Sequence, residues 1–245
     1  MERKVQGKFS DVGFLGFDVY GTVVDWRTSI ARESEGLLKK YGIHIDPLTF
    51  AEQWRSYYQP SMEPIRAGQR AFVTLDVLNQ ENLTALLKTY GVDRTQLKID
   101  EFAHWVAAWE RLTPWPDSVE GLTRLKRKFA IGPISNGHIA GMMHLARYAK
   151  LPWDAILGAG LTNTYKPQHQ TYLKSAMAVG LAPQRMAMIA AHNDDLAAAR
   201  ACGFKTVYVN RPTEYGPNQT KDLNATGDWD HVVGSITEAA DALGC

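Results

Sequence analysis

Short apolar runs alternate with longer helical stretches from Pro114 to the C-terminus. The runs Phe129 to Ser135, Met186 to Ala191 and Lys205 to Asn210 have the length and composition of buried strands. An earlier apolar run, Val12 to Phe17, predicts the first strand. Strands that alternate with helices in this way are typical of a parallel sheet. The sequence therefore predicts an α/β fold.

Residues 27 to about 111 interrupt this alternation and have the apolar spacing of helices. Three apolar sets recur at helical intervals, namely Ile30, Leu37, Leu38 and Tyr41; Phe50, Trp54, Tyr57 and Tyr58; and Phe102, Trp105, Val106 and Trp109. Asp46-Pro47 is a plausible helix start, and Gly42 and Gly91 are plausible helix ends. We expect a helical insertion in the α/β part of the chain.

Polar residues follow three of the predicted strands at their carboxyl ends. Asp18 follows the first strand, Ser135 and Asn136 close the second, and residues 192–195 (His-Asn-Asp-Asp) follow the third. Ligands of open parallel sheets bind beyond these strand ends. The three segments are therefore expected to converge on one crevice, which the helical insertion is placed to cover.

Asp18 is the most informative of these residues. A carboxylate at the end of a buried strand is costly to bury and is therefore expected to have a function. Gly21 permits a sharp turn beneath it, which leaves backbone N–H groups near the carboxylate. This arrangement suits a nucleophile.

The segment Asp18-Val19-Tyr20-Gly21-Thr22-Val23 resembles the first motif of the haloacid dehalogenase superfamily, in its L-2-haloacid dehalogenase branch. The resemblance extends over nearly the whole chain. It implies a doubly wound, Rossmann-like parallel sheet (residues 10–26 and 112–245) with an inserted helical cap domain (residues 27–111). It also implies that 2-haloalkanoic acids are hydrolysed to 2-hydroxyalkanoic acids, with inversion, through an ester on Asp18.

Two later segments match the second and third motifs. Ile134-Ser135-Asn136-Gly137 resembles the segment whose hydroxyl and amide hold the substrate carboxylate and orient the nucleophile, although a simple strand-end turn is the alternative. Lys166 resembles the lysine that keeps the nucleophile ionised, because a nearby positive charge lowers a carboxyl pKa by about 1 to 3 units. The alternative for Lys166 is a surface lysine. Tyr172 matches a tyrosine near the same charges, or is a core residue.

The fourth motif departs from the pattern of magnesium-dependent members. Those members have an acid at the position aligned with Ala191 and a second one aligned with Asp195, and Mg²⁺ needs such oxygen ligands. Tyr20 stands where phosphoryl-transfer members have a general acid. A halide needs no proton to leave, so these differences favour displacement at carbon over phosphate ester hydrolysis. We expect no metal and no cofactor.

The remaining candidate residues are assigned by resemblance. Asp195 and His192 are expected to position or activate water, with Asp194 capping the following helix unless the alignment slips by one. Arg55 resembles the arginine that receives the departing halide, and a surface ion pair is its alternative.

Four further side chains complete the predicted site and its surroundings. Tyr20 and Phe72 are expected to line the halide pocket, or to be core residues. Asn193 is expected to contact substrate. His138 is expected either to cap a helix or to touch substrate.

Composition narrows the partners of this 245-residue chain. A net charge of +1 gives no overall electrostatic attraction to nucleic acid or acidic membranes. The longest stretch without Asp, Glu, Lys or Arg, residues 129–146, contains too many polar residues to span a membrane. Two cysteines make no disulfide framework, which favours the cytoplasm. The expected partner is a small 2-haloacid, and exposed aromatic residues of the insertion would permit a homodimer.

Two other functions stay open at this point. One is a magnesium-dependent phosphatase of the same fold, with Asp18 as phosphoryl acceptor. The other is a binding protein that keeps the scaffold without its chemistry, since a fold does not guarantee a reaction. The set Asp18, Ser135, Lys166 and Asp195 argues against the second, because binding alone does not require it.

Overall fold

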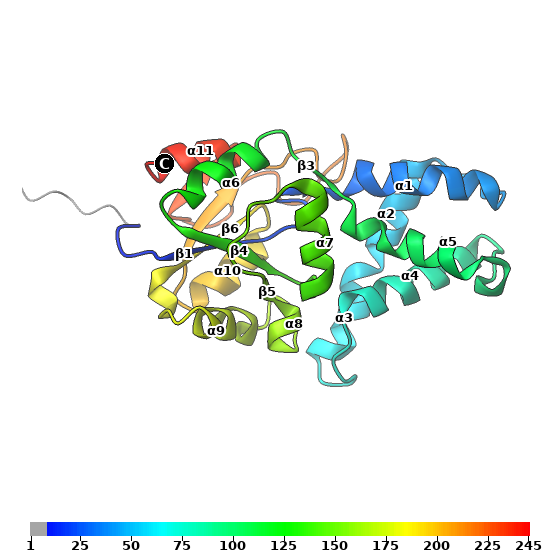
Figure 1. The fold of residues 1–245 in the computed structure, drawn as a ribbon, viewed down its shortest axis with the longest axis horizontal. Helices are drawn as coiled ribbons and strands as arrows, with labels where there is room; N and C mark the ends of the chain where they lie inside the picture. The colour runs from blue at the N-terminus through cyan, green and yellow to red at the C-terminus, as the bar shows by residue number, and fades with distance from the viewer. Residues whose placement is uncertain (1–8) are drawn as a thin grey trace, which may run out of the picture.

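The computed structural model describes residues 9–245, and its centre is a parallel sheet of six strands (Figure 1). In spatial order the strands are β5 (Leu157–Gly158), β4 (Ala130–Ser135), β1 (Phe14–Phe17), β6 (Met186–Ala190), β7 (Lys205–Val209) and β8 (His231–Val233). Every adjacent pair in this sheet is parallel. The predicted α/β fold with a doubly wound sheet is confirmed.

The four predicted strands are present, each within two residues of its predicted ends. The edge strands β5 and β8 were not predicted, because two and three residues are too short to give an apolar run. The chain moves outward from β1 to β4 and β5, and then returns to the other side of β1 to form β6. The carboxyl end of β1 is therefore the topological switch point, where ligands of such sheets bind.

Helices cover both faces of the sheet (Figure 1). Helices α6 (Ser118–Lys126) and α11 (Ile236–Ala242) pack together on one face, and α9 (His169–Ala178) and α10 (Asn193–Ala201) cover the other. The remaining elements of this part are α7 (Ile139–Ala149), α8 (Ala159–Thr162) and the short 3₁₀ helix η3 (Pro183–Arg185).

The segment between β1 and α6 is helical and lies beside the sheet, on the right in Figure 1. It contains α1 (Trp26–Lys40), α2 (Pro47–Ser56), α3 (Tyr58–Arg66), α4 (Leu75–Thr89), η1 (Arg94–Gln96), α5 (Ile99–Val106) and η2 (Ala107–Glu110). Asp46 caps α2 with Pro47 at its start, and α1 and α4 end just before Gly42 and Gly91, as predicted.

The chain enters and leaves this helical part through one short antiparallel ladder. β2 (Val24–Asp25) pairs with β3 (Thr113–Pro114), so both crossings between the helical part and the sheet part lie side by side. No helix among residues 9–245 combines the length and apolar character needed to span a membrane.

An aromatic core gives the helical part a fixed shape. Phe50 stacks on Trp105 with ring centroids 5.4 Å apart, and Trp54 meets Trp109 edge-on at 5.6 Å. All four side chains are buried. Because Trp54 anchors α2 in this core, its neighbour Arg55 is held on another face of the helix.

Candidate active site

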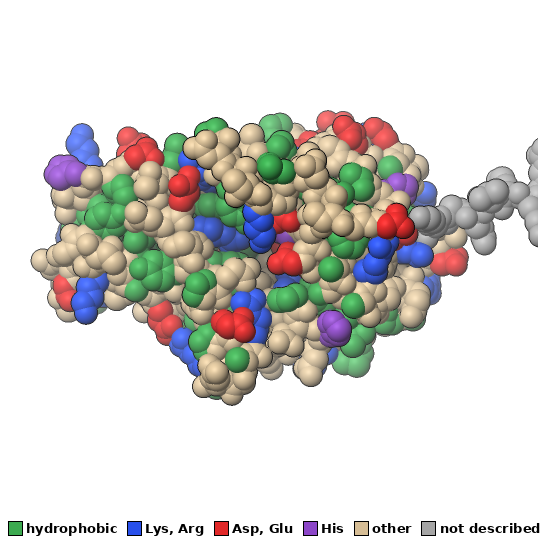
Figure 2. Space-filling model, turned by 180° about the vertical axis from the view of Figure 1, so that it is seen from behind, with side chains coloured by type: hydrophobic (Ala, Val, Ile, Leu, Met, Phe, Trp, Pro, Cys, Tyr) green, Lys and Arg blue, Asp and Glu red, His purple; other side chains and the backbone are tan. Residues whose placement is uncertain are grey.

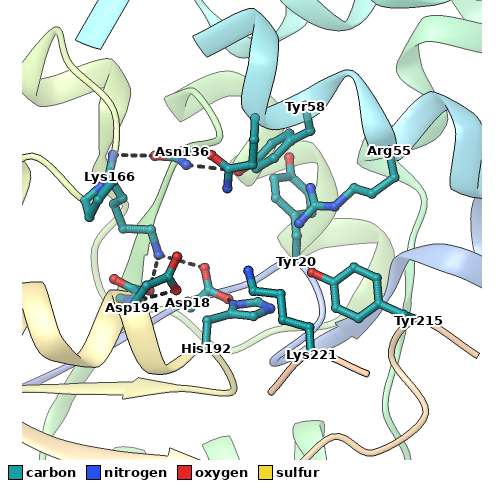
Figure 3. A pocket seen from close by; sticks show the side chains of 13 residues that line it. Asp18, Tyr20, Arg55, Tyr58, Asn136, Lys166, His192, Asp194, Tyr215 and Lys221 are labelled. Carbon is teal, nitrogen blue, oxygen red and sulfur yellow. Dashed lines mark hydrogen bonds and ion pairs between the residues drawn. The ribbon is translucent and has the colours of Figure 1, made fainter. Parts of the chain in front are cut away.

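A pocket lies beyond the carboxyl ends of β1 and β6, at the junction with α2 and α3 (Figure 3). Its cavity volume is about 50 Å³, so the space beside these side chains fits a small ligand. Seen from behind, basic and acidic side chains lie together between the helical part and the sheet part (Figure 2). The pocket is lined by Asp18, Tyr20, Arg55, Tyr58, Gln59, Asn136, Lys166, Pro167, His192, Asp194, Asp195, Tyr215 and Lys221.

Asp18 is buried at the end of β1 and accepts three hydrogen bonds or ion pairs. Its Oδ1 lies 2.7 Å from Lys166 Nζ, and its Oδ2 lies 2.8 Å from Thr22 Oγ1 and 3.0 Å from His192 Nδ1. Burial alone would raise the pKa of Asp18, but the charge of Lys166 and the contact with His192 outweigh it and hold the pKa well below 3.8. Asp18 is therefore an ionised carboxylate at neutral pH.

Lys166 joins two buried carboxylates. Its ammonium lies 2.5 Å from Asp195 Oδ2, in addition to its contact with Asp18. Burial lowers the pKa of Lys166, yet Asp18 and Asp195 together raise it above 10.5. Tyr172 Oη donates to Asp195 Oδ1 at 2.6 Å, so both oxygens of Asp195 have partners.

The register of the fourth motif is settled by these contacts. Asp195 is the acid that reaches Lys166, whereas Asp194 Oδ1 accepts from the backbone N–H of Asp195 at the start of α10. Asp194 lies in the first turn of α10 and lines the pocket. It is not the cap expected from the sequence, because His192 is the N-cap residue and makes no side-chain cap hydrogen bond.

The side chains around Asp18 do not fit a magnesium ion. The Lys166 ammonium occupies the space between Asp18 and Asp195 where a cation would be shared. Ala191 offers no side-chain oxygen, and its N–H donates to Thr22 Oγ1 at 2.9 Å. Within residues 9–245, no group of three or more His, Cys, Asp or Glu side chains is arranged to hold a metal.

Ser135 and Asn136 end β4 next to the pocket. Ser135 is fully buried, and its Oγ accepts from the N–H of Gly137 at 3.1 Å, so it stabilises the turn that follows β4. Asn136 lines the pocket itself. Its Oδ1 accepts from the Lys166 N–H at 2.8 Å and its Nδ2 donates to Tyr58 Oη at 3.0 Å, which links the sheet part to α3.

Arg55 enters the pocket from α2 and is surrounded by aromatic rings. Its guanidinium carbon lies 3.8 Å from the centroid of the Tyr58 ring, and the rings of Trp26, Tyr20 and Trp109 lie within 5.9 Å. Among residues 9–245 its buried Nη1 has no hydrogen-bond partner and the side chain has no ion pair. The surface ion pair considered from the sequence is therefore not formed, and the Arg55 guanidinium lies in the pocket with no ion pair among the described residues.

Four side chains expected in the site do not line the pocket. Ser135 and Tyr172 are buried behind it and contact Gly137 and Asp195, whereas Phe72 and Asn193 make contacts elsewhere. Phe72 packs on Tyr165 at 5.4 Å, because the chain after α3 turns toward the loop that precedes Lys166. The Asn193 side chain points away from the pocket. Its amide forms hydrogen bonds with backbone or side-chain atoms of Asp222, Asn224, Thr226 and Trp229. Asn193 therefore fastens the 222–229 loop.

His138 is a helix cap, one of the two alternatives considered for it. Its Nε2 lies 3.3 Å from Gly141 N at the start of α7 and 2.7 Å from Asp76 Oδ2 on α4. The neutral ring can accept from the Gly141 N–H, whereas the protonated ring donates from the same nitrogen to Asp76. The contact ties the sheet part to the helical part, away from the pocket.

Seven pocket residues or supports had no assigned role in the sequence analysis: Thr22, Tyr58, Gln59, Pro167, Glu214, Tyr215 and Lys221. Tyr58 follows Arg55 by three residues, a spacing that places side chains on one helix face and that would have suggested it. Residues 211–222 have no periodic pattern, so nothing in the sequence indicated that this segment returns to the site.

Comparison with known proteins gives the class of the chain. Residues 15–203 match the model of the haloacid dehalogenase-like hydrolases. A crystal structure of a defluorinating L-2-haloacid dehalogenase is 45% identical, with 96% of each chain covered and a TM-score of 0.93. That of another L-2-haloacid dehalogenase is 39% identical, with 95% of this chain and 98% of the other covered and a TM-score of 0.89.

Curated sequences agree with the structures. The (S)-2-haloacid dehalogenase 4A of Burkholderia cepacia is 28% identical, with 91% of this chain and 96% of the relative covered. The chain belongs to the haloacid dehalogenase-like hydrolases, in the branch of the L-2-haloacid dehalogenases.

Proposed function

We propose that this protein is a hydrolytic dehalogenase that converts short L-2-haloalkanoic acids to 2-hydroxyalkanoic acids with inversion. One observation carries the proposal: Asp18 is held ionised by Lys166 in a pocket that also contains the Arg55 guanidinium, whose Nη1 has no hydrogen-bond partner among residues 9–245. A carboxylate nucleophile and a positive site for a departing anion are the two groups that halide displacement requires.

In the first step, a carboxylate oxygen of Asp18 attacks the halogen-bearing carbon from the side opposite the halogen. The new O–C bond forms as the C–halogen bond breaks, and the electron pair leaves with the halide. Arg55 stabilises the developing halide charge, in a setting of aromatic rings that includes Tyr20. Fixed donors of this kind each contribute roughly 10² to 10³ in rate.

In the second step, water attacks the carbonyl carbon of the Asp18 ester and releases the hydroxy acid. Backside attack inverts the carbon centre once, and hydrolysis at the carbonyl leaves that centre untouched. Inversion of (S)-2-chloropropionate thus gives the (R)-hydroxy acid.

Recognition of the substrate carboxylate falls to the turn after β4. Asn136 lines the pocket, and we assign its side-chain amide, which now donates to Tyr58 Oη, to the substrate carboxylate. Ser135 does not line the pocket and supports the turn by accepting from the Gly137 N–H. Tyr172 positions Lys166 indirectly, because it donates to Asp195, which in turn binds the Lys166 ammonium.

We also assign the chain to two domains, an α/β core (residues 10–26 and 112–245) and a helical cap (residues 27–111). The division is supported by the β2–β3 ladder, through which the chain both enters and leaves the helical part. Arg55 and Tyr58 come from the cap, and Asp18 and Lys166 from the core. Movement between the two would open the pocket to substrate.

The same-fold rival is a magnesium-dependent phosphatase. The test compares halide release from (S)-2-chloropropionate and its (R) enantiomer with hydrolysis of a generic phosphate ester in Mg²⁺, with the Asp18→Asn protein as control. We expect halide release from the (S) enantiomer alone and none from the control. Phosphate release without halide release from any 2-haloacid would reject the dehalogenase.

Two further assignments rest on the sequence. A cytoplasmic location agrees with the two cysteines, Cys202 and Cys245, both of which are free thiols. A homodimer was suggested by exposed aromatic residues of the insertion, but the aromatic side chains that pack its core are buried. The homodimer remains a prediction without support from those residues.

A further inference from the structure

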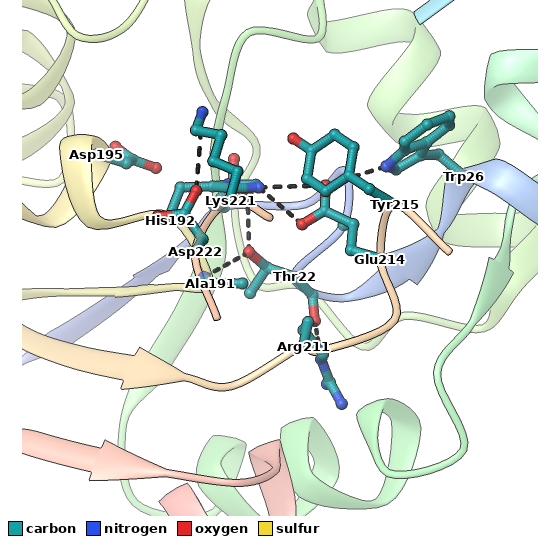
Figure 4. Close-up of polar contacts among 12 residues, drawn as sticks. Thr22, Trp26, Ala191, His192, Asp195, Arg211, Glu214, Tyr215, Lys221 and Asp222 are labelled. Atoms are coloured by element: carbon teal, nitrogen blue, oxygen red, sulfur yellow. Dashed lines mark hydrogen bonds and ion pairs between the residues drawn. The ribbon is translucent and has the colours of Figure 1, made fainter. Parts of the chain in front are cut away.

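Glu214 is a buried carboxylate that the mechanism above does not use. It lies in the segment after β7 with only 1% of its surface exposed (Figure 4). Its Oε2 and Oε1 lie 2.9 and 3.2 Å from His192 Nε2, and Oε1 also accepts from Trp26 Nε1 at 3.0 Å. A carboxylate this deep needs partners of this kind to offset the cost of burial.

The first-motif turn is shaped to admit this side chain. Gly21 has a φ of +90°, and a Cβ built there would stand 2.1 Å from Glu214 Oε1. Arg211 fixes the returning segment, because its Nε donates to the carbonyl oxygen of Thr22 at 2.9 Å and its own carbonyl accepts from the Glu214 N–H at 3.2 Å. Glu214 therefore has one defined position, directly beside the nucleophile turn.

The two ring nitrogens of His192 face different carboxylates. Nε2 meets Glu214, while Nδ1 lies 3.0 Å from Asp18 Oδ2. A carboxylate on one nitrogen fixes the proton there and leaves the other nitrogen to act on the reacting group. We propose that His192 is the general base that activates water for hydrolysis of the Asp18 ester, with Glu214 as its positioning residue.

This inference rests on the proposed dehalogenase function and assigns the second step to the pair His192–Glu214. The competing candidate for the base is Asp195. Both oxygens of Asp195 already accept hydrogen bonds, from Lys166 and Tyr172, and its link to Asp18 runs through the Lys166 ammonium. His192 contacts Asp18 directly, within the reach of one water molecule from its carbonyl carbon.

The protons balance over the cycle. In the free enzyme, His192 lies between Asp18 and Glu214 and is an imidazolium. Alkylation removes the negative charge of Asp18, and the His192 imidazolium then loses a proton to solvent. Neutral His192 then takes a proton from water as the oxygen adds to the ester carbon. The Cγ–O bond to the product breaks, and one proton of that water ends on the product hydroxyl and the other on His192. Asp18 is again a carboxylate, and one proton and one halide have been released per turnover.

Electrostatics support this cycle. Burial lowers the pKa of His192, but Glu214 and Asp18 outweigh it and raise the pKa well above 6.5 in the free enzyme. Removing the Asp18 charge removes one of those two contributions, so the pKa falls when the ester forms. The other titratable groups around the ring are Tyr208, Tyr215, Lys221, Asp194 and Lys166.

The test uses Glu214→Gln, which keeps the size of the side chain and removes its charge. Rapid-quench measurements follow (S)-2-chloropropionate in the wild type, Glu214→Gln and His192→Gln. Glu81→Gln, which alters a surface ion pair with Arg70, is the matched control. The readouts are the halide burst, the mass of the peptide that contains Asp18, and the pH dependence of ester hydrolysis.

We expect Glu214→Gln to release one halide per site in a burst and then to turn over about 10² times more slowly or worse, with the ester retained on Asp18. His192→Gln should retain the ester as well. The acid limb of ester hydrolysis, where the rate falls as His192 becomes protonated, should move to lower pH by about 1 to 3 units in Glu214→Gln, a change that a purely structural role would not produce. Glu81→Gln should match the wild type.

The possible failures are distinguishable. If the wild type releases no halide from any 2-haloacid, the proposed function itself fails. If the wild type turns over and neither His192→Gln nor Glu214→Gln accumulates ester, the His192–Glu214 assignment is overturned. Ester accumulation in Asp195→Asn alone would give the role of base to Asp195. Should Glu214→Gln misfold, as judged by tryptophan fluorescence, His192→Gln decides the question.

Discussion

Lys166 Nζ lies 2.7 Å from Asp18 Oδ1, and the two side chains come from positions 148 residues apart in the chain. The same ammonium reaches Asp195, so one cation serves two buried acids. This triad occupies the switch point of the sheet, where the ends of β1 and β6 and the loop before α9 meet.

Removal of the Lys166 charge should disable the nucleophile. In Lys166→Met, only the contact with His192 still opposes the effect of burial, so the pKa of Asp18 should be higher than in the wild type. Residual activity should therefore gain an acid limb and fall as pH drops through that pKa. Turnover should decrease by roughly 10² or more. An uncompensated buried charge should also cost about 3 to 5 kcal/mol of unfolding free energy, measured by urea denaturation.

Lys174→Met is the matched control, because Lys174 on the neighbouring helix donates only to the carbonyl oxygen of Thr162. It should keep wild-type activity. A folded Lys166→Met protein with unchanged turnover at neutral pH would remove Lys166 from the mechanism.

Arg55→Ala should lose the halide site. Without the guanidinium, turnover should fall by roughly 10² because the developing halide charge has no partner. Since Trp26 and Trp109 lie within 5.9 Å of this group, bromide titration should quench tryptophan fluorescence in the wild type and quench it less in the variant. The control is Arg70→Ala, in an exposed ion pair with Glu81. Equal quenching and turnover in Arg55→Ala and the wild type would assign Arg55 to packing.

Activity should not depend on a metal ion. Lys166 fills the position between Asp18 and Asp195, and Tyr20 and Ala191 supply no carboxylate. Halide release should therefore persist after exhaustive treatment with EDTA and should not rise when Mg²⁺ is added. Activity that disappears with EDTA and returns with Mg²⁺ would mean that a cation enters this site after all.

The contact between His138 and Asp76 should make stability depend on pH. The hydrogen bond to Asp76 is the main cause that raises the pKa of His138 above 6.5 in the folded state. A raised pKa of this kind stabilises the fold fully below pH 6.5, and the contribution is lost as pH rises through the folded value. Asp76 is 41% exposed, so the effect should be at most about 1 kcal/mol.

Asp76→Asn tests this contribution. Its unfolding free energy should be lower than that of the wild type at pH 5.5 and nearly equal to it at pH 9, as measured by urea denaturation at both values. A difference that grows with pH would contradict the assignment.

The sequence predicts the sheet and the polar strand ends well, because both depend on strong local patterns, whereas Lys166 was assigned only by its resemblance to a family motif. Asp18, Ser135 and Asp195 each end or follow a buried apolar strand, and parallel strands bring their carboxyl ends together. The insertion was recognised by its helical spacing, although its internal packing was not predicted, since helix contacts depend on tertiary fit.

The missed parts depend on irregular backbone. Glu214 lies in a segment without periodicity, and its position is fixed only by long-range contacts to His192 and Trp26. Phe72 and Asn193 were assigned to the pocket from their place along the chain, but side-chain direction in a loop or at a helix start is set by tertiary contacts that a sequence does not display.

The most direct test of the account is the fate of oxygen in a single turnover in H₂¹⁸O. If Asp18 attacks carbon and water then attacks the Asp18 carbonyl, the first hydroxy acid released must contain an unlabelled oxygen from the protein, and the label must remain on Asp18. Mass spectrometry of the product and of the peptide containing Asp18 measures both. Labelled product in the first turnover, with Asp18 unlabelled, would contradict the account and show that water is the nucleophile.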